Sequence, residues 1–447
     1  MLTVKEIKYG NESTFKFIVS NANKIDYEQT IHFKSVIKEY SGYNFMYIYT
    51  PSMEVISSVF EFLNFQIRDY AINSRIKALQ ALKLLYTFQK VIDTDFTKFT
   101  AQDVMSFRAF LRGHSSSSNF LNLQLITSRT ASTVNGYFSV YRDYAKFLGV
   151  KKTALLHRTN VRGAQSHHLA QEYYTSIKTP TNKKEVPWYI SVDEFYKICD
   201  FVRKDNDIVA EIIVRLMYES GLRIGEVLGL TNDDIFLEKA KEGLVPMLTI
   251  RNRVSDATYQ KAKTCMKVFT KNDYITSDYS VNNYGYQRAF ASYELYDLIN
   301  DYIESTHAKY LVGGNENIHS SIMADRVVSS DDITPNFYIF VNKYDQLLTA
   351  QTWNIRLRRI FETVNIHVDK NKKKHNLNHR FRHGFAMYHI KYQKIDKVEL
   401  AELMRHRSIL SVEQYYKPTI ADQAELKNKF VEDLYDLIPS LRRNSYE

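Results

Sequence analysis

Apolar residues recur at helical spacing along the second part of the chain. In residues 74–92 the side chains that share one helical face are Ile76, Leu79, Leu84, Leu85 and Phe88. Residues 100–113 open with the T-x-x-D capping pattern and end at a glycine. Residues 132–149 repeat the apolar spacing and also end at a glycine. The pattern predicts a helical bundle over residues 56–150.

The flanking segments follow other patterns. Residues 1–55 hold short β-branched and aromatic runs, TFKFIVS and YNFMYIYT, which predict a small N-terminal extension containing strands. Residues 151–186 are polar and basic, a composition typical of an interdomain linker.

The rest of the chain predicts a mixed domain. Over residues 187–420, an S-x-x-E capping box begins one helix and Gly221 ends the next. Residues 245–253 and 263–271 favour two strands of a small sheet, joined as a hairpin by a basic turn. Residues 421–447 contain an amphipathic tail helix. The predicted fold class is mostly α with a small β-sheet.

Composition narrows the class of protein. A chain of 447 residues is too long for one ordinary core, so two or three domains are expected. Its net charge of +10 favours a polyanionic partner, nucleic acid before a membrane surface, although solubility alone would also explain it. The two cysteines, Cys199 and Cys265, exclude a disulfide framework and a cysteine-based zinc site. No signal core or long apolar run is present, so we expect a cytoplasmic protein.

Four widely separated clusters carry residues suited to chemistry. Taken in chain order, they contain Arg223 after a glycine helix stop, Lys261 and Lys263 in the predicted hairpin, then His379, Arg382 and His383, and finally His406 with Tyr415 and Tyr416. Each alone is most often a surface or packing residue.

A metal site is one alternative for the third cluster. His379 and His383 are four positions apart, the spacing of a metalloprotease helix. That motif needs a glutamate directly after the first histidine, and Arg380 stands there instead. The arginines would also repel a dication, so we expect no metal.

Phosphoryl transfer accounts for the four clusters together. The transition state at a phosphodiester spreads negative charge over its oxygens, and fixed arginines stabilise that charge. A tyrosine nucleophile would form a phosphotyrosyl ester that keeps the energy of the broken bond. The departing 5′-hydroxyl needs a general acid, for which a lysine is suited.

The order of these motifs resembles the tyrosine recombinase (phage integrase) family. GLRIGEVLGL is similar to its first arginine motif, LNHRFRHGFA to its H-x-L-R-H motif, and LMRHRSILSVEQYY to its Leu-Gly-His-Ser-Ser…Tyr motif. The resemblance covers roughly residues 58–420 and implies a helical core-binding domain followed by a mixed α+β catalytic domain. It implies no cofactor.

The resemblance also implies roles for individual residues. Arg223 and Arg382 would grip the scissile phosphate, and His406 would hydrogen-bond it. Lys263, which precedes a threonine as the family's lysine commonly does, would protonate the leaving hydroxyl, with Lys261 as the alternative. His379 would assist proton transfer at the tyrosine. Glu226 and His383 would support the site.

The register of the last motif selects the nucleophile. In the family the tyrosine lies nine positions after the last histidine, which gives Tyr415, with Tyr416 as the alternative. Three positions depart from the motif: Arg405, Arg407 and Val412 replace its usual Gly, Ser and Thr.

The expected activity is site-specific DNA recombination for a mobile element, through a 3′-phosphotyrosyl intermediate and a four-way junction. The resemblance implies duplex DNA with specific core sites, a homotetramer joined by the tail helix, and an accessory directionality factor as further partners. Residues 1–55 could bind arm sites. The residues expected to contact DNA are Arg129, Arg142, Lys146, Lys372, Lys373 and Lys374, together with Lys261. A type IB topoisomerase-like enzyme and a DNA-binding regulator on the same scaffold remain alternatives.

Overall fold

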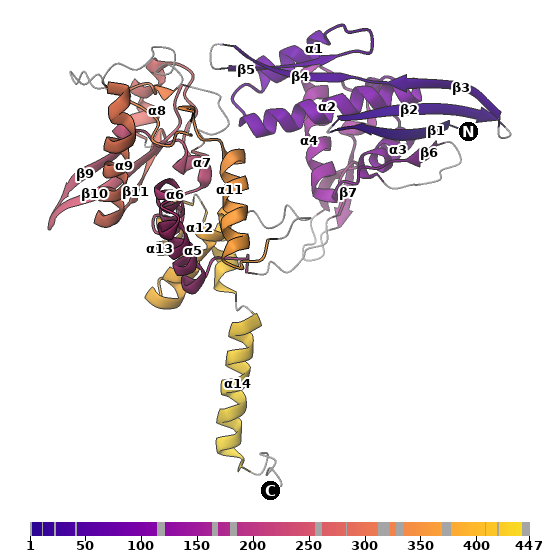
Figure 1. The fold of residues 1–447 in the computed structure, drawn as a ribbon. Helices are drawn as coiled ribbons and strands as arrows, with labels where there is room; N and C mark the ends of the chain where they lie inside the picture. The colour runs from indigo at the N-terminus through magenta and orange to yellow at the C-terminus, as the bar shows by residue number, and fades with distance from the viewer. Residues whose placement is uncertain are drawn as a thin grey trace. The chain divides into compact units, whose positions relative to one another are not determined.

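The protein is seen in a computed structural model that describes most of the chain. The described residues are 2–10, 12–21, 24–40, 43–113, 121–162, 169–178, 186–254, 262–282, 284–311, 322–327, 335–342, 344–368, 377–406, 408–417 and 420–439. They form two compact units, Met1–Asn182 and Lys183–Glu447. Helices dominate and the sheets are small, which confirms the predicted fold class (Figure 1).

The first unit combines the N-terminal strands with the helical bundle. Its described helices are α1 (Ser57–Glu61), α2 (Ile72–Ile92), α3 (Ala101–Arg112) and α4 (Ala131–Phe147). Its described strands are β1 (Leu2–Tyr9), β2 (Glu12–Asn21), β3 (Lys24–Ile31), β4 (Lys34–Tyr40), β5 (Tyr43–Tyr49), β6 (Leu121–Gln124), β7 (Arg158–Arg162) and β8 (Leu169–Tyr173). The T-x-x-D box at the start of α3 is confirmed, since Thr100 and Asp103 cap each other's backbone N–H groups.

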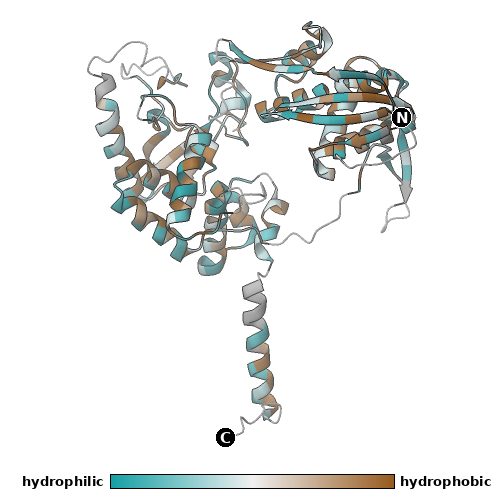
Figure 2. Cartoon of the chain, turned by 45° about the vertical axis from the view of Figure 1, so that its right-hand side comes forward, coloured by the Kyte–Doolittle hydropathy of each residue, from teal (hydrophilic) through white to brown (hydrophobic). Residues whose placement is uncertain are grey.

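The N-terminal strands and the bundle share one core. Strand β6, which lies between α3 and α4 in sequence, pairs in parallel with β1 and completes a sheet of order β3-β2-β1-β6. Val4 and Phe15 of this sheet are buried in the same cluster as Leu85 and Phe107 of the helices. Hydrophobic and hydrophilic residues alternate along these strands, as expected for a sheet with one covered face (Figure 2). Residues 1–55 are therefore packed as part of the bundle.

A buried carboxylate ties β1 to the segment that follows β6. Glu6 Oε2 accepts hydrogen bonds from the backbone N–H groups of Ile126 (2.8 Å) and Thr127 (2.7 Å). Its Oε1 accepts from the hydroxyls of Thr127 and Ser13, both at 2.6 Å. One side chain of β1 thus satisfies donors from two other segments, β2 and the residues after β6.

The segment predicted as a linker holds structure of its own. Strands β7 and β8 form an antiparallel pair, and both fall within the first compact unit. The compact units therefore divide the chain near residue 182. As functional domains, the ranges 1–55, 56–150, 151–186, 187–420 and 421–447 stay predictions.

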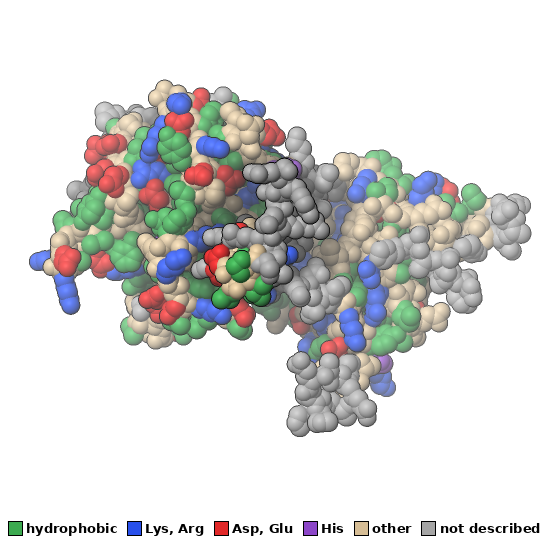
Figure 3. All heavy atoms as spheres, turned by 90° about the horizontal axis from the view of Figure 1, so that it is seen from below, with side chains coloured by type: hydrophobic (Ala, Val, Ile, Leu, Met, Phe, Trp, Pro, Cys, Tyr) green, Lys and Arg blue, Asp and Glu red, His purple; other side chains and the backbone are tan. Residues whose placement is uncertain are grey.

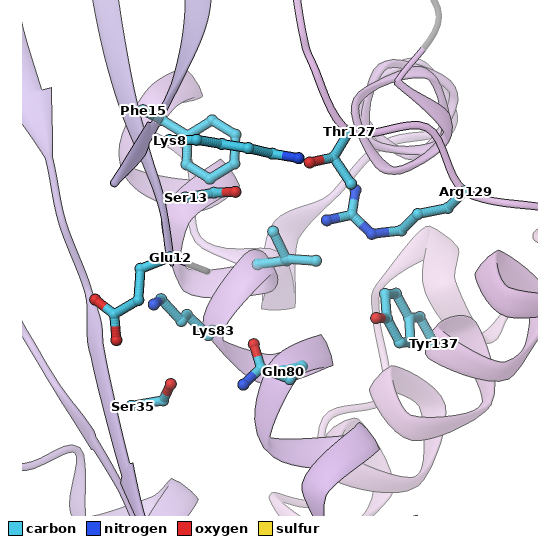
Figure 4. Close-up of a pocket in the computed structure, with 11 residues that line it drawn as sticks. Lys8, Glu12, Ser13, Phe15, Ser35, Gln80, Lys83, Thr127, Arg129 and Tyr137 are labelled. Carbon is cyan, nitrogen blue, oxygen red and sulfur yellow. The ribbon is translucent and has the colours of Figure 1, made fainter. Parts of the chain in front are cut away.

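The first unit also contains a basic hollow of about 300 Å³. Lys8, Lys83 and Arg129 line it, with Glu12 and Tyr137 (Figure 4). Burial lowers the pKa of the Lys83 amine, and the charge of Glu12 opposes that shift. Arg129, which we expected to contact DNA, thus faces a cationic recess.

The second unit is a mixed α+β domain around its own core. Its described helices are α5 (Val192–Lys204), α6 (Ile208–Tyr218), α7 (Ile224–Val227), α8 (Ser277–Ser280), α9 (Tyr293–Leu311), α11 (Ala350–Thr363), α12 (Leu377–Tyr388), α13 (Lys397–Leu403) and α14 (Ile420–Leu437). The strands β9 (Ile235–Ala240), β10 (Gly243–Arg251) and β11 (Tyr286–Phe290) form a sheet of order β11-β10-β9. The predicted Ser191–Glu194 capping box at α5 is confirmed. No helix among the described residues combines the length and apolar character needed to span a bilayer.

The predicted hairpin of residues 245–253 and 263–271 is wrong. Residues 243–251 form β10, but its partners are β9 and β11, and the described residues from 262 to 270 form turns. The Asn252 side chain explains the difference. Its amide donates to the carbonyls of Ala262 (3.0 Å), Cys265 (3.0 Å) and Met266 (2.9 Å), in place of strand pairing.

The first prediction concerns the hydrogen bonds that Glu6 of β1 accepts from the segment after β6. Replacing Glu6 by alanine removes the acceptor of the part-buried N–H groups of Ile126 and Thr127, so opening of strand β1 should become easier by about 2 kcal/mol. Native-state hydrogen exchange over residues 2–9 and 121–127 measures this. Glu39→Ala, on the exposed face of β4, is the control. Equal exchange in both variants would contradict the role of Glu6.

Candidate active site

The first arginine lies in the turn between α6 and α7. Gly221 adopts φ +60°, and a Cβ there would approach the Phe385 ring to 2.9 Å, so glycine is required. Two residues later, Arg223 precedes α7 with extended backbone. Its Nη1 lies 2.5 Å from Oε1 of the buried Glu226, and its backbone N–H donates to Oε2 at 2.9 Å. Glu226 therefore fixes both the backbone and the guanidinium of Arg223.

Helix α12 contributes the second arginine and two histidines. His379, Arg382 and His383 are three and four positions apart, so they share one helical face. Arg382 is buried and donates to the carbonyls of Gly221 and Met404. It thus joins the turn before Arg223 to the turn before His406.

The structure gives the two adjacent tyrosines different surroundings. Tyr415 lies in the short 3₁₀ turn Glu413–Tyr416 and is only 3% exposed. Its hydroxyl is 2.6 Å from Nδ1 of His383. The Tyr416 hydroxyl donates instead to the carbonyls of Ile395 (3.0 Å) and Asp396 (2.5 Å). Tyr415 is therefore the tyrosine that faces the histidines and arginines.

The two other histidines complete the group. The His379 ring stacks on His383 with centroids 5.8 Å apart. The backbone N–H of His406 donates to Ala401 at 2.8 Å, which fixes the start of its turn. Its buried Nε2 has no hydrogen-bond partner among the described residues. A phosphate oxygen would supply such a partner.

Burial and positive charge keep the histidines neutral. Burial, followed by the charges of His379, Arg382 and His406, lowers the pKa of His383 to about 3. Burial, followed by Arg382, Arg223 and Arg405, lowers the pKa of His406 to about 4. The pKa of His379 is lowered by burial and then by Arg223, Arg382 and Lys263. At neutral pH these rings are therefore uncharged in the DNA-free protein.

The pKa values of Tyr415 and Arg382 are also shifted. Burial raises the pKa of Tyr415, while the charges of Arg382 and Arg223 oppose the rise. The phenol is thus protonated and can donate to the neutral His383. Burial and then the charge of Arg223 lower the pKa of Arg382 to about 9, a sign of excess positive charge.

Lys263 lies in an exposed turn beside the site. Its charge acts on His379, and the Asn252 amide holds the backbone around it. Thr264 next to it donates to the Gln287 side chain of β11 at 2.7 Å. Lys261, the alternative acid, lies outside the described residues.

The residues expected to contact DNA have separate surroundings. Arg142 Nη1 donates to Thr175 Oγ1 at 2.7 Å and lies over the Tyr173 ring, and Lys146 is largely exposed. Arg129 donates to the Leu111 carbonyl at 3.1 Å. Basic side chains are interspersed with acidic and uncharged ones on the face shown in Figure 3. Lys372, Lys373 and Lys374 lie outside the described residues.

Sequence reasoning missed the part played by Arg405. It noted an arginine in place of the motif's glycine and assigned it no contact. In the structure Arg405 has φ +53°, and its buried guanidinium lies 3.4 Å from Glu226. An arginine at a glycine position beside a candidate catalytic histidine was the available signal.

Comparison with known proteins identifies the family of the chain. The model of the Phage integrase family matches residues 189–421, a little over half of the chain. The chain belongs to this family.

The individual relatives have low sequence identity to this chain. Transposase A from transposon Tn554 of Staphylococcus aureus is 29% identical over 212 residues, 44% of this chain and 57% of that protein. The chain thus spans little more than half the length of that relative. Tyrosine recombinase XerC of Psychromonas ingrahamii is 33% identical over 96 residues, 21% of this chain and 31% of that protein. Among solved structures, the Tn1549 transposon integrase with transposon right end DNA has 14% identity and a TM-score of 0.47, over 84% of this chain and 99% of that one.

The second prediction follows from the neutral state of His383. Its folded pKa of about 3 lies below the ordinary histidine value of about 6.5, so the unfolded chain binds this proton first as the pH falls. Above pH ~6.5 His383 does not lower the free energy of unfolding. This free energy decreases as the pH falls from there toward 3, and the loss reaches about 2 kcal/mol at pH 5. The His383→Gln variant should therefore lose less stability than wild type between pH 7 and pH 5.

Thermal unfolding of the DNA-free protein at both pH values measures this difference. The exposed His157→Gln variant is the control and should follow wild type. A His383→Gln protein with the wild-type pH dependence would refute the assignment.

Proposed function

We propose that this protein is a site-specific DNA recombinase of a mobile element, which cleaves and rejoins strands through a 3′-phosphotyrosyl intermediate. The observation that carries the proposal is the Tyr415 hydroxyl, held 2.6 Å from His383 beside Arg382. The similarity to a transposase and to a tyrosine recombinase supports the same reaction class.

The reaction begins when Tyr415 Oη attacks the scissile phosphorus. Its proton passes to His383, the nearest acceptor, with His379 stacked behind. The proposal thus gives His383 the role that the family resemblance implied for His379. Arg223, Arg382 and His406 stabilise the charge that develops on the non-bridging oxygens. The bond from phosphorus to the 5′-oxygen breaks, and Lys263 protonates that oxygen.

The proton acceptor matters because the phenol is a weak acid. At neutral pH, ionising even an ordinary tyrosine costs about 4 kcal/mol, and burial raises the pKa of Tyr415 further. Transfer of the proton to His383 during attack avoids a free phenolate. This transfer requires the bound phosphodiester anion to offset the positive charges that, with burial, lower the pKa of His383 in the DNA-free protein. The phosphotyrosyl ester retains the energy of the broken bond, so a 5′-hydroxyl can reverse the steps and reseal the strand.

The proposed partners follow from the same reaction. The substrate is duplex DNA with specific core sites, and exchange of strands between two duplexes requires four active sites, hence a homotetramer. Helix α14 suits protomer docking because Phe430 and Leu437 are exposed on it. An accessory directionality factor and a cytoplasmic location complete the proposal.

The third prediction tests the nucleophile. On a nicked suicide duplex carrying the core site, with chelator present, wild type and Tyr416→Phe should form a covalent protein–DNA adduct. Tyr415→Phe should form none, because no other described hydroxyl occupies the same position against His383. A denaturing gel measures the adduct.

The alternatives give different results in the same experiment. An adduct lost only in Tyr416→Phe would move the nucleophile by one position. Tight binding without any adduct would favour a DNA-binding regulator. Adduct formation with relaxation of a plasmid, but without exchange between two sites, would favour a topoisomerase-like enzyme.

A further inference from the structure

The side chain of Arg405 connects two segments that are far apart in sequence. Its Nη1 donates to the Ser220 carbonyl and its Nη2 to the Gly221 carbonyl, both at 3.2 Å. These carbonyls belong to the turn that leads into Arg223. Arg405 itself directly precedes His406, in the segment that continues to Tyr415.

The contact with Glu226 extends this connection to the first arginine. Glu226 Oε1 binds the Arg223 guanidinium at 2.5 Å, whereas Oε2 lies 3.4 Å from Arg405 Nη2. The carboxylate is fully buried, so both oxygens depend on these partners rather than on water. Arg405 therefore acts on the aim of Arg223 through Glu226.

The backbone of Arg405 adopts a conformation that is uncommon for arginine. Its φ of +53° lies in the left-handed region that glycine adopts freely and arginine rarely does. Such a conformation persists only where surrounding contacts hold it. Here those contacts are the two carbonyls and Glu226.

Arg405 also contributes to the positive charge around Glu226. Arg223, Arg382 and Arg405 surround one carboxylate, and burial followed by the charge of Arg223 lowers the pKa of Arg382. The group thus carries excess positive charge away from water, which a phosphodiester anion would offset. Arg405 adds to this charge without itself facing the nucleophile's hydroxyl.

We infer that Arg405 is a positioning residue that holds Glu226 and the Ser220–Gly221 turn so that Arg223 is aimed at the scissile phosphate. The inference rests on the proposed function, because it assigns the aim of Arg223 to strand cleavage. It adds a third arginine to the two that the motifs supply.

The test compares Arg405→Gly, Arg405→Lys and wild type as full-length proteins on the nicked suicide duplex. Arg405→Gly should fold, since glycine suits the left-handed backbone, and should still bind the duplex, so the rate is measured at saturating protein. Its single-turnover rate of adduct formation should fall by about 10- to 100-fold, the loss expected for hydrogen bonds to a charged group. Arg405→Lys should recover part of this rate.

Two controls separate positioning from a general structural effect. Asn206→Gly makes the same backbone change at an exposed residue with φ +53° and should cleave at the wild-type rate. In a Glu226→Gln background, Arg405→Gly should cost less than it does alone, because the two residues act through one contact. Hydrogen exchange over residues 220–228 should rise in Arg405→Gly and not in Asn206→Gly.

Each contrary outcome has a distinct meaning. A wild-type cleavage rate in Arg405→Gly, or full additivity with Glu226→Gln, would overturn the inference. If wild type itself forms no adduct, the proposed function fails, and the exchange measurement still decides the structural part. Unchanged exchange at residues 220–228 would then reject the contact as a positioning element.

Discussion

One buried carboxylate, that of Glu226, opposes three guanidinium groups, of which those of Arg382 and Arg405 are buried and that of Arg223 is partly exposed, and the rest of the candidate site depends on this imbalance. A charge removed from water must find a partner, and here Arg223 and Arg405 share the two oxygens of Glu226. Arg382 uses the carbonyls of Gly221 and Met404 instead. The same contacts bring together three chain segments, from α6–α7, α12 and the turn after α13. The contacts that compensate the charges are therefore the same contacts that assemble the site.

Local signals in the sequence predicted the elements that depend on neighbouring residues. The capping boxes at Thr100 and Ser191 and the helix stop at Gly221 are such features, because the groups that interact lie within a few positions of each other. Tyr415 and Tyr416 could not be separated by local chemistry. The register of the motif favoured Tyr415, and the packing of the turn directs that residue toward His383.

Features that join distant segments could not be read from the sequence. Residues 263–271 have a strand-like composition, but β11 takes the place beside β10, and Asn252 holds the residues that follow 261 as turns. The contact between Arg405 and Glu226 spans 179 positions, so no spacing rule reveals it. The shared core of the N-terminal strands and the bundle is hidden for the same reason, since the composition of residues 1–55 does not reveal which distant residues they contact.

The parallel pairing of β1 with β6 also constrains how the chain can fold. Leu2 pairs with Leu121, so β1 lacks this partner until the whole stretch of chain between the two strands has been synthesised. Closing a loop of this length has an entropic cost before any pairing contact forms, and such topologies fold slowly. The residues of β1 are therefore among the later ones to reach their final pairing. Until then, the edge of β1 that will bind β6 remains open to other strands.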